Sequence, residues 1–410
     1  MRIIVVGGGA SGLMCASLLS KDGHKVILIE KNEKLGKKLF ITGKGRCNLT
    51  NDCSVQDFLA NVVVNPKFIM SAINKFNSQD TMNFFEDNSL KLKVERGNRV
   101  FPLSDKSSDV IKCFEKILKA NNVEIMLNTK VKDIIIKDNT AVGVMTFDDK
   151  IITGDKVVIA TGGISYSSTG STGDGYKWAK KLGHNIVELR PALVPILLQN
   201  TYGLQGLSLK NVSANILRDD KVLYTQFGEM LFTHNGVSGP IILSLSSLIN
   251  KHYNNGKFDA KYILTIDLKP ALSYEILENR LIREFSERSN CEIKNILPSL
   301  MPKALVQIVL SFAKIKPTQV ANSVTKAQRE KLAHVIKNLP FDIKGLENIN
   351  AGIITSGGVD CKQINPKDMM SKIVDNLYFI GEVLDIDALT GGFNLQIAFC
   401  SANQMAQSIN

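Results

Sequence analysis

The chain has 410 residues, of which 44% are hydrophobic and 22% are charged, and its formal net charge is +11. This length exceeds what one small core needs and predicts two domains, while the composition is that of a soluble globular protein. Its apolar runs are too short to span a membrane and its N-terminus lacks the pattern of a signal peptide, so we expect a cytoplasmic protein with no membrane partner.

The positive charge raises the question of a nucleic-acid partner. Lysines greatly outnumber arginines, and basic residues are spread along the chain with acids between them. No RNA-binding motif or long basic arm is present, so we expect a solvated lysine-rich surface and no nucleic acid. The seven scattered cysteines and five separated histidines predict neither a disulfide framework nor a metal site.

The first thirty residues carry the most informative pattern. A β-branched run at residues 3–6 predicts a buried parallel strand, and leucines and alanines at helical spacing follow it. Between them, Gly7, Gly9 and Gly12 form G-x-G-x-x-G. Gly7 permits the tight turn, Gly9 lets the backbone approach a pyrophosphate, and Gly12 lets helix and strand pack closely. The helix N-terminus offers unpaired N–H groups to the phosphates.

A second apolar strand, residues 26–29, ends at Glu30, where a carboxylate accepts hydrogen bonds from ribose hydroxyls. The complete strand, turn, helix, strand and acid make a dinucleotide fingerprint, which suits NAD and FAD equally. Glu30 argues against NADP, because a carboxylate repels a 2′-phosphate.

Two further strands end in glycine turns. The apolar run before Thr161 leads into Gly162 and Gly163, and the predicted strand 377–380 leads into Gly381 and Glu382. Beyond the latter, Gly391 and Gly392 open another helix, whose N-terminal dipole suits the isoalloxazine end of a flavin. Ligands lie at the carboxyl ends of parallel strands, so one extended dinucleotide could touch all three turns.

Six segments in chain order resemble the flavoprotein family of the aminoacetone oxidases and the BaiN-type bile-acid reductases. They are GGGASGL, GKKLFITGKGRCNLTN, ATGGISYSSTGSTGDGYKWAKKLGH, GEMLFTHNGVSGP, TSGGVD and NLYFIGEVLDIDALTGGFNLQIAF. The resemblance spans nearly the whole chain. It implies FAD as the cofactor and an α/β fold, in which a Rossmann-like FAD-binding domain of the two-dinucleotide-binding-domain flavoprotein type carries an inserted domain.

The resemblance also implies which residues contact the cofactor. The TGKGRCN loop would line the flavin, its glycines allowing close approach and Lys44 and Arg46 offsetting phosphate charge. The implied FAD-binding residues are Gly7, Gly9, Ala10, Ser11, Gly12, Glu30, Lys31, Lys37, Lys38, Thr42, Gly43, Gly45, Arg46, Cys47, Asn48, Val131, Thr161, Gly162, Gly163, Gly381, Glu382, Gly392, Asn394, Leu395 and Gln396.

The expected organisation is a discontinuous flavin domain, residues 1–190 and 350–410, interrupted by an insert at 191–349. Within the insert, alternating apolar residues predict a β-barrel-like part over 191–270, and helical periodicity predicts helices over 271–340.

The function expected from these features is FAD-dependent oxidoreduction of a small organic substrate, by amine oxidation or by NAD(P)H-dependent reduction of a carbonyl or enone. NAD(P)H stays open as a transient reductant, and the oligomeric state is not predicted. The resemblance places His234, on a glycine-rich turn, over the flavin ring, where it could transfer a proton. The structural alternatives are that His234 caps the following turn or fixes the interface between the domains.

Two other functions stay open. A dithiol-disulfide flavoenzyme would use Cys47 and Cys53, although five residues separate these cysteines instead of the usual four, and no second fingerprint for NAD(P)H is visible. A flavin-dependent RNA-modifying protein is suggested by the net charge alone.

Overall fold

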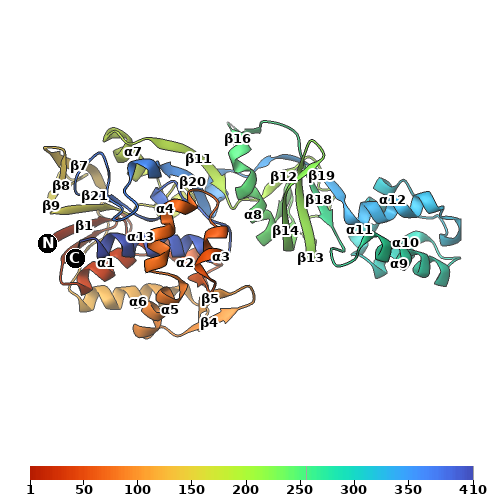
Figure 1. Cartoon of the computed structure of the whole chain (residues 1–410), viewed down its shortest axis with the longest axis horizontal. Coiled ribbons are helices and arrows are strands. Elements are labelled where there is room, and N and C mark those ends of the chain that lie inside the picture. The colour runs from red at the N-terminus through yellow and green to blue at the C-terminus, as the bar shows by residue number, and fades with distance from the viewer. Residues whose placement is uncertain (255, 410) are drawn as a thin grey trace. The chain divides into compact units, whose positions relative to one another are not determined.

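Figure 1 shows the computed structural model of the chain, coloured from the N-terminus to the C-terminus. The structure describes residues 1–254 and 256–409. Asn255, in the predicted insert, and Asn410, the last residue of the predicted flavin domain, lie outside the described residues. Among the helices within these ranges, none is both long enough and apolar enough to cross a membrane.

The chain divides into two units, which are described separately. The first unit comprises Met1–Ala192 and Ile349–Asn410, and the second unit comprises Leu193–Asn348. The domain limits expected from the sequence differ from these by one or two residues.

A parallel sheet forms the centre of the first unit. Its strands, in spatial order, are β21 (Leu377–Phe379), β10 (Lys156–Ile159), β1 (Arg2–Val6), β2 (Lys25–Ile29) and β6 (Glu124–Met126). All neighbours pair in parallel, and β1 is buried from Ile3 to Val6. Continuous apolar runs form such strands because both faces of a parallel sheet are covered. The predicted Rossmann-type fold is therefore confirmed.

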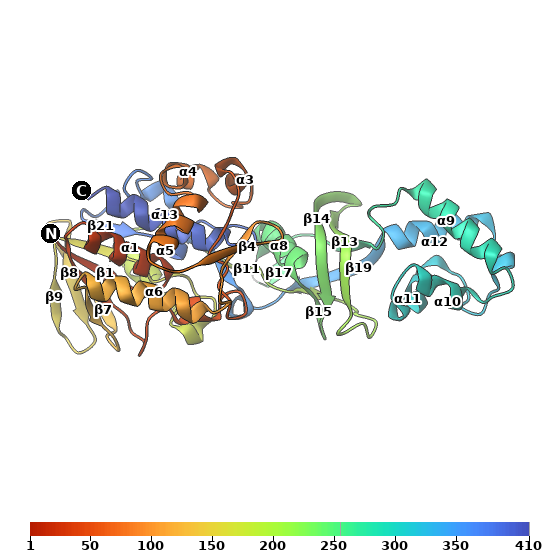
Figure 2. The same cartoon turned by 90° about the horizontal axis from the view of Figure 1, so that it is seen from below.

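Helices cover this sheet, and Figures 1 and 2 show α1 and α13 side by side. The two helices pack tightly enough that Cys15 Sγ lies 3.6 Å from Met405 Sδ, and both side chains are fully buried. The helices of this unit are α1 (Ala10–Lys21), α2 (Lys37–Ile41), α3 (Val55–Ala60), α4 (Pro66–Lys75), α5 (Ser78–Asp87), α6 (Ser107–Ala120), α7 (Asp174–Lys181) and α13 (Phe393–Gln407).

An antiparallel pair of strands explains how the first unit tolerates a long insert. The chain leaves through β11 (Ile186–Ala192) and returns through β20 (Ile354–Val359), and Ala192 pairs with Ile354. The two ends of the insert are thus adjacent. Two small sheets complete the unit: β3 (Thr50–Asn51), β5 (Arg99–Pro102) and β4 (Leu92–Glu95), and β7 (Val131–Lys137), β8 (Thr140–Thr146) and β9 (Ile151–Thr153).

The second unit contains a closed barrel. Its strands, in spatial order, are β12 (Ile196–Leu198), β15 (Gly236–Ser238), β14 (Lys221–Phe232), β13 (Ser208–Arg218), β18 (Tyr262–Asp267) and β19 (Leu339–Leu346). The expected limits of the barrel, 191–270, are wrong, because β19 closes the barrel after the helices. Its alternation, with Leu339, Phe341 and Ile343 buried, is the signal that could have revealed it.

Between β18 and β19 the chain forms a helical part. Its helices are α9 (Tyr274–Glu287), α10 (Ile293–Ile296), α11 (Lys303–Ala313) and α12 (Lys326–Lys337). Another helix, α8 (Pro240–Ile249), packs on the barrel, and a short hairpin of β16 (Tyr253–Asn254) and β17 (Lys257–Phe258) follows it. Apolar side chains from barrel and helices share one buried cluster, so this unit has its own core.

The fingerprint glycines give a matched test of the fold. A Cβ at Gly12 would lie 1.9 Å from the Gly7 carbonyl oxygen, whereas a Cβ at Gly9 would have no atom within 4 Å. We expect Gly12→Ala to destabilise the cofactor-free chain by roughly 1–3 kcal/mol or more, because α1 must move away from β1. Gly9→Ala should leave stability unchanged. Urea unfolding of both variants measures this, and equal stabilities would contradict the close packing.

Candidate functional site

The first glycine turn connects β1 to α1 at the carboxyl edge of the sheet. Gly7 has φ +112°, and a Cβ there would lie 2.5 Å from the Ala160 carbonyl oxygen. Gly9 is the N-cap of α1, and no side chain caps this helix. The N–H groups of its first turn, which includes Ala10 and Ser11, therefore remain free for an anion.

Glu30 lies at the end of β2 with only 8% of its surface exposed. One carboxylate oxygen accepts from the Gly8 N–H at 2.8 Å, and the other accepts from the Asn32 N–H at 2.8 Å and its Nδ2 at 2.7 Å. The oxygen bound by Gly8 keeps a further lone pair for a ribose hydroxyl, whereas the two hydrogen bonds from Asn32 occupy the other oxygen. Neighbouring Lys31 forms an ion pair of 2.8 Å with Asp174 at the start of α7, so its charge is already balanced.

The loop between Thr42 and Asn48 is held in left-handed backbone conformations. Gly43, Lys44, Gly45 and Cys47 all have φ between 59° and 83°. The Cys47 N–H donates to the Thr42 carbonyl at 3.0 Å, which closes the loop on itself. Glycine adopts such conformations freely, whereas Lys44 and Cys47 adopt them only with backbone strain. The surrounding structure must therefore hold the loop in a defined shape.

Arg46 and Lys37, two of the residues that the resemblance implies for the cofactor, each pair with carboxylates of the protein. Arg46 pairs with the carboxylates of Glu95 and Asp105 and stacks over Phe101 with 4.2 Å to the ring centroid. These carboxylates raise the pKa of Arg46 above its ordinary value. Lys37 pairs with Glu33 at 3.3 Å. Both cations are thus balanced within the protein.

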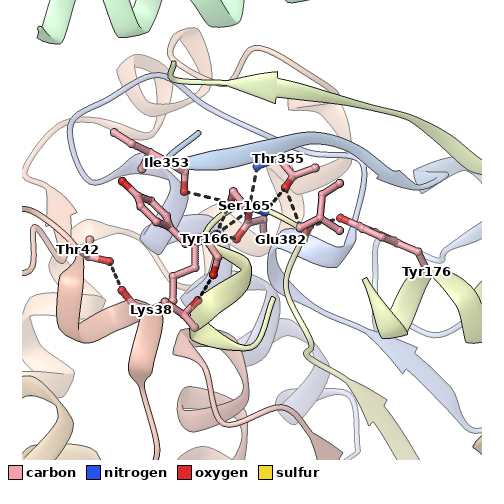
Figure 3. A network of polar contacts seen from close by, with 10 residues as sticks. Lys38, Thr42, Ser165, Tyr166, Tyr176, Ile353, Thr355 and Glu382 are labelled. Carbon is pink, nitrogen blue, oxygen red and sulfur yellow. Dashed lines mark hydrogen bonds and ion pairs between the residues drawn. The ribbon is translucent and has the colours of Figure 1, made fainter. Parts of the chain in front are cut away.

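Lys38 and Glu382, predicted separately, are partners. Figure 3 shows Lys38, Ser165, Thr355 and Glu382 in one polar network. Lys38 Nζ donates to both Glu382 oxygens at 2.8 and 3.0 Å and to Ser165 Oγ at 2.7 Å. The Thr355 N–H donates to Glu382 Oε1 at 2.9 Å. The network ties α2, the loop after β10, β20 and the turn after β21 together.

The glycine turns also meet directly. A Cβ at Gly381 would lie 2.5 Å from Ser11 Oγ, and one at Gly163 would lie 2.9 Å from Glu382 Oε1. The turns after β21, β10 and β1 are therefore neighbours, because these strands are adjacent and parallel, and ligands of such sheets bind at this edge. Gly162, with φ +70°, completes the middle turn.

The helix α13 begins at a second glycine N-cap, Gly392, with φ +101°. A Cβ at Gly392 would lie 2.4 Å from the Thr50 carbonyl oxygen. Asn394 binds the backbone of Ala388, accepting from its N–H at 2.9 Å and donating to its carbonyl at 2.8 Å. This side chain therefore shapes the loop before the helix.

Three other predicted residues have mainly structural surroundings. Gln396 is fully buried and accepts from the hydroxyls of Thr50 and Thr81 at 2.7 and 2.8 Å. Leu395 packs against the core, and Val131 begins β7 with its side chain buried. Gln396 and Val131 would therefore contact a cofactor only through their backbone, whereas the side chain of Leu395 is partly exposed.

The cysteines and His234 do not form an evident catalytic group. Every cysteine in the described residues is a free thiol. Burial raises the pKa of Cys47 well above its ordinary value, and burial, with Asp57 and Asp52, raises that of Cys53 to about 11. His234 is exposed in the second unit, where its Nδ1 lies 2.8 Å from Gln205 Oε1. Its predicted role over the ring stays a prediction.

Sequence reasoning missed Asp387, in the loop between β21 and α13. Only 1% of it is exposed, and neither carboxylate oxygen has a hydrogen-bond partner in the described part of the chain. Burial raises its pKa to about 7, and the nearby carboxylates of Asp385 and Glu382 add to this effect. The Ser356 hydroxyl is close enough to lower that pKa somewhat, but it is not in hydrogen-bond geometry.

Buried polar atoms without partners test whether the site fits a cofactor. Asn48 Oδ1 and Thr161 Oγ1 are both buried and lack any hydrogen-bond partner among the described residues. Unpaired polar atoms of this kind are costly unless a ligand or water satisfies them. With the open space at Gly9, the uncapped α1 and the Glu30 carboxylate, they suit an elongated dinucleotide.

The raised pKa of Asp387 predicts a stability that depends on pH. The folded chain keeps a proton that the unfolded chain loses above an ordinary value of 3.8, so stability falls as pH rises towards 7. We compare the unfolding free energy of Asp387→Asn with that of the natural chain at each pH. This difference should shift in favour of the variant by a few kcal/mol, as an order of magnitude, between acidic and alkaline pH. Urea unfolding on both sides of this window measures it. An equal effect at both pH values would mean that Asp387 is not protonated in the folded chain.

The Lys38–Glu382 pair can be tested by a double-mutant cycle on the cofactor-free chain. Lys38→Met should cost about 1–3 kcal/mol, because it leaves a mostly buried carboxylate without its cation. Adding Glu382→Gln should recover part of that loss. Lys37→Met is the control: its partner Glu33 is 59% exposed and solvent screens the pair, so the loss of stability should be much smaller. Additive effects in the cycle would show that the pair does not stabilise the loops.

Comparisons with known proteins agree with this geometry. Residues 1–408 match the family described as HI0933-like protein Rossmann domain. A 3-dehydro-bile acid delta(4,6)-reductase of Clostridium scindens is 28% identical over 98% of this chain and 97% of its own. A ribosomal RNA dihydrouridine synthase of Escherichia coli is 29% identical over 99% of this chain and 97% of its own.

Solved structures share the fold. A 3-ketosteroid-delta4-(5alpha)-dehydrogenase from Rhodococcus jostii superimposes with a TM-score of 0.52 at 12% identity, covering 98% of this chain and 96% of its own. A flavocytochrome c3 fumarate reductase gives 0.53 at 17% identity, covering 99% and 77%. The chain therefore belongs to the HI0933-like family of Rossmann-domain proteins, and it is an FAD-dependent oxidoreductase.

Proposed function

We propose that this enzyme reduces a carbon–carbon double bond conjugated with a carbonyl group. The observation that carries this proposal is the pair of full-length relatives, one named for reducing a bile acid and the other for making dihydrouridine. Both names describe saturation of a ring double bond, although the molecules differ greatly in size. The shared element is an electron-poor double bond next to a carbonyl.

Such a reaction makes distinct demands on the protein. Bound FAD supplies, once reduced, the hydride for the β-carbon of the double bond. The chain must hold the dinucleotide, and we assign that task to the turns at Gly7–Gly12, Thr161–Gly163 and Gly381–Glu382, with Glu30 at the ribose. Asn48 Oδ1 and Thr161 Oγ1 would satisfy polar atoms of the cofactor. The Lys38–Ser165–Glu382 network keeps these turns together.

A proton must also reach the α-carbon of the substrate. His234 is our candidate, because a Nδ1–H donated to Gln205 Oε1 leaves Nε2 free to exchange a proton. NAD(P)H is the proposed reductant of the flavin.

The other expected functions have less support. The similarity to an L-amino acid oxidase of Cerastes cerastes covers only 38 residues, 9% of this chain, and so carries no argument for amine oxidation. A dithiol mechanism needs a thiolate, whereas burial raises the pKa of both Cys47 and Cys53. RNA modification uses the same bond chemistry as the proposal, which makes it a question of substrate.

Single-turnover flavin spectroscopy under anaerobic conditions tests the proposal. Protein reduced with NADPH, NADH or dithionite is mixed with a 3-oxo-Δ4 steroid acid or with a uridine-containing RNA transcript. We expect one of these to reoxidise the flavin and to gain two hydrogens by mass spectrometry. His234→Ala should slow this step by roughly a hundredfold while FAD remains bound. Flavin reduction by amines, with no reoxidation by either conjugated substrate, would overturn the proposal.

A further inference from the structure

The positive charge of the chain is concentrated in one segment of the second unit. Residues 293–329 contain six lysine or arginine residues and no aspartate or glutamate, although acids make up 39 of the 410 residues overall. A segment of that length would otherwise carry three or four acids. The segment starts at α10, includes α11 and ends within α12. This segment is therefore an exception to the mixing of basic and acidic residues along the rest of the chain.

Only part of this charge is balanced by nearby carboxylates. Lys294 pairs with Glu292, and Lys326 and Arg329 pair with Glu330 and Glu278. The other three cations, Lys303, Lys314 and Lys316, form no ion pair within the described residues. All three are exposed.

These three lysines lie along one face of α11 and just beyond its end. Lys303, Gln307, Ser311 and Lys314 follow one another at intervals of four, four and three residues, which places them on the same side of a helix. All four are exposed, and Lys316 follows two residues later. We call these five residues the basic face. The opposite side of α11, including Leu305 and Val309, is buried in the core of the unit.

A hollow of about 320 Å³ lies at the C-terminal end of the basic face. Its polar lining comes from residues of the basic face, and its apolar lining comes from the residues around the helix end. The lining residues are Gln307, Ser311, Lys314 and Lys316, with Leu310, Ile315 and Pro317. Figure 2 shows α11 beside α10 at the edge of the helical part, away from α9.

We propose that the basic face of α11 binds the phosphate backbone of RNA and thereby holds an RNA substrate for the enzyme. This inference rests on the proposed function, since it selects uridine in RNA as the molecule that carries the conjugated double bond. Lysine, amide and hydroxyl groups are the side chains that contact phosphates and sugars without reading sequence. The hollow, with its apolar lining, can accept part of a nucleotide next to those phosphates.

RNA suits this face better than a membrane or a protein partner. A helix that lies on a membrane needs large apolar side chains on its surface, and protein interfaces depend on buried aromatic or aliphatic anchors. Among the described residues, the exposed large hydrophobic side chains of this unit lie on other elements, and α11 has none. Charge without an apolar anchor is typical of binding to a polyanion backbone.

Binding measurements with a matched pair of triple variants test the proposal. One variant carries Lys303→Gln, Lys314→Gln and Lys316→Gln. The control carries Lys210→Gln, Lys221→Gln and Lys257→Gln, three exposed lysines of the same unit with no ion pair among the described residues. Both lose the same charge. Bound FAD and urea unfolding confirm that each variant is folded.

The probe is a short fluorescein-labelled single-stranded RNA of mixed sequence, titrated by anisotropy at several salt concentrations. We expect the natural chain and the control to bind alike. The α11 variant should lose roughly tenfold or more in affinity at about 100 mM salt, and its salt slope should fall by about 2, since each phosphate contact contributes about 0.7. Equal losses in both variants, or no binding by the natural chain, would overturn the proposal.

Two further probes separate the other partners. Vesicles of phosphatidylcholine with phosphatidylserine represent an anionic membrane, and polyglutamate represents an acidic protein. Binding to either one as tightly as to RNA would also overturn the proposal. The binding assay uses no reductant, so its result on RNA binding is valid even if the proposed reduction fails. Conversely, the α11 variant can be tested for reduction of the steroid acid, which measures the chemistry independently of the basic face.

Discussion

The close approach of backbone at the carboxyl edge of the central sheet is the constraint on which the site depends. Gly7 leaves no room for a Cβ against Ala160, and Gly12 leaves none against Gly7 itself. Because β1 lies between β2 and β10 in parallel, these contacts bring the first two glycine turns together. The Gly381 turn then reaches Ser11 at the start of α1. A bulkier residue at any of these places would separate the parts of the cofactor site.

Around this edge, the protein balances charges and leaves some neutral polar atoms unpaired. Lys31, Lys38 and Arg46 are each held by carboxylates, because an unpaired cation at a partly buried position loses hydration that nothing replaces. The unpaired atoms, such as Thr161 Oγ1 and Asn48 Oδ1, are those that a ligand can satisfy. Asp387 differs, because burial raises its pKa to about 7, so it keeps its proton below that pH and avoids the cost of a buried charge there.

The insert adds a second, separate core without disturbing the first. The β11–β20 pair brings the two ends of the insert side by side, so the long excursion costs the first unit little. Within the insert, the helical part is itself carried between two barrel strands, β18 and β19, which pair with each other. The dinucleotide fingerprint thus lies in one unit, and residues 293–329, which contain no acidic residue, lie in the other. In our proposals, the first unit holds the cofactor, and the second unit supplies the RNA-binding face and the candidate proton donor His234.

The sequence by itself determined the Rossmann fold and the three glycine turns, because local signals specify them: apolar runs, glycines at set spacing and one acid at a strand end. The choice of FAD over NAD came from the resemblance of six segments to a flavoprotein family. Only the tertiary structure decided which charges pair. Lys38 and Glu382 are 344 residues apart, and no local pattern links them. The burial of Asp387 and the pairing of β19 with β12 and β18 also depend on what the rest of the chain places alongside, although the alternation of β19 itself can be read from the sequence.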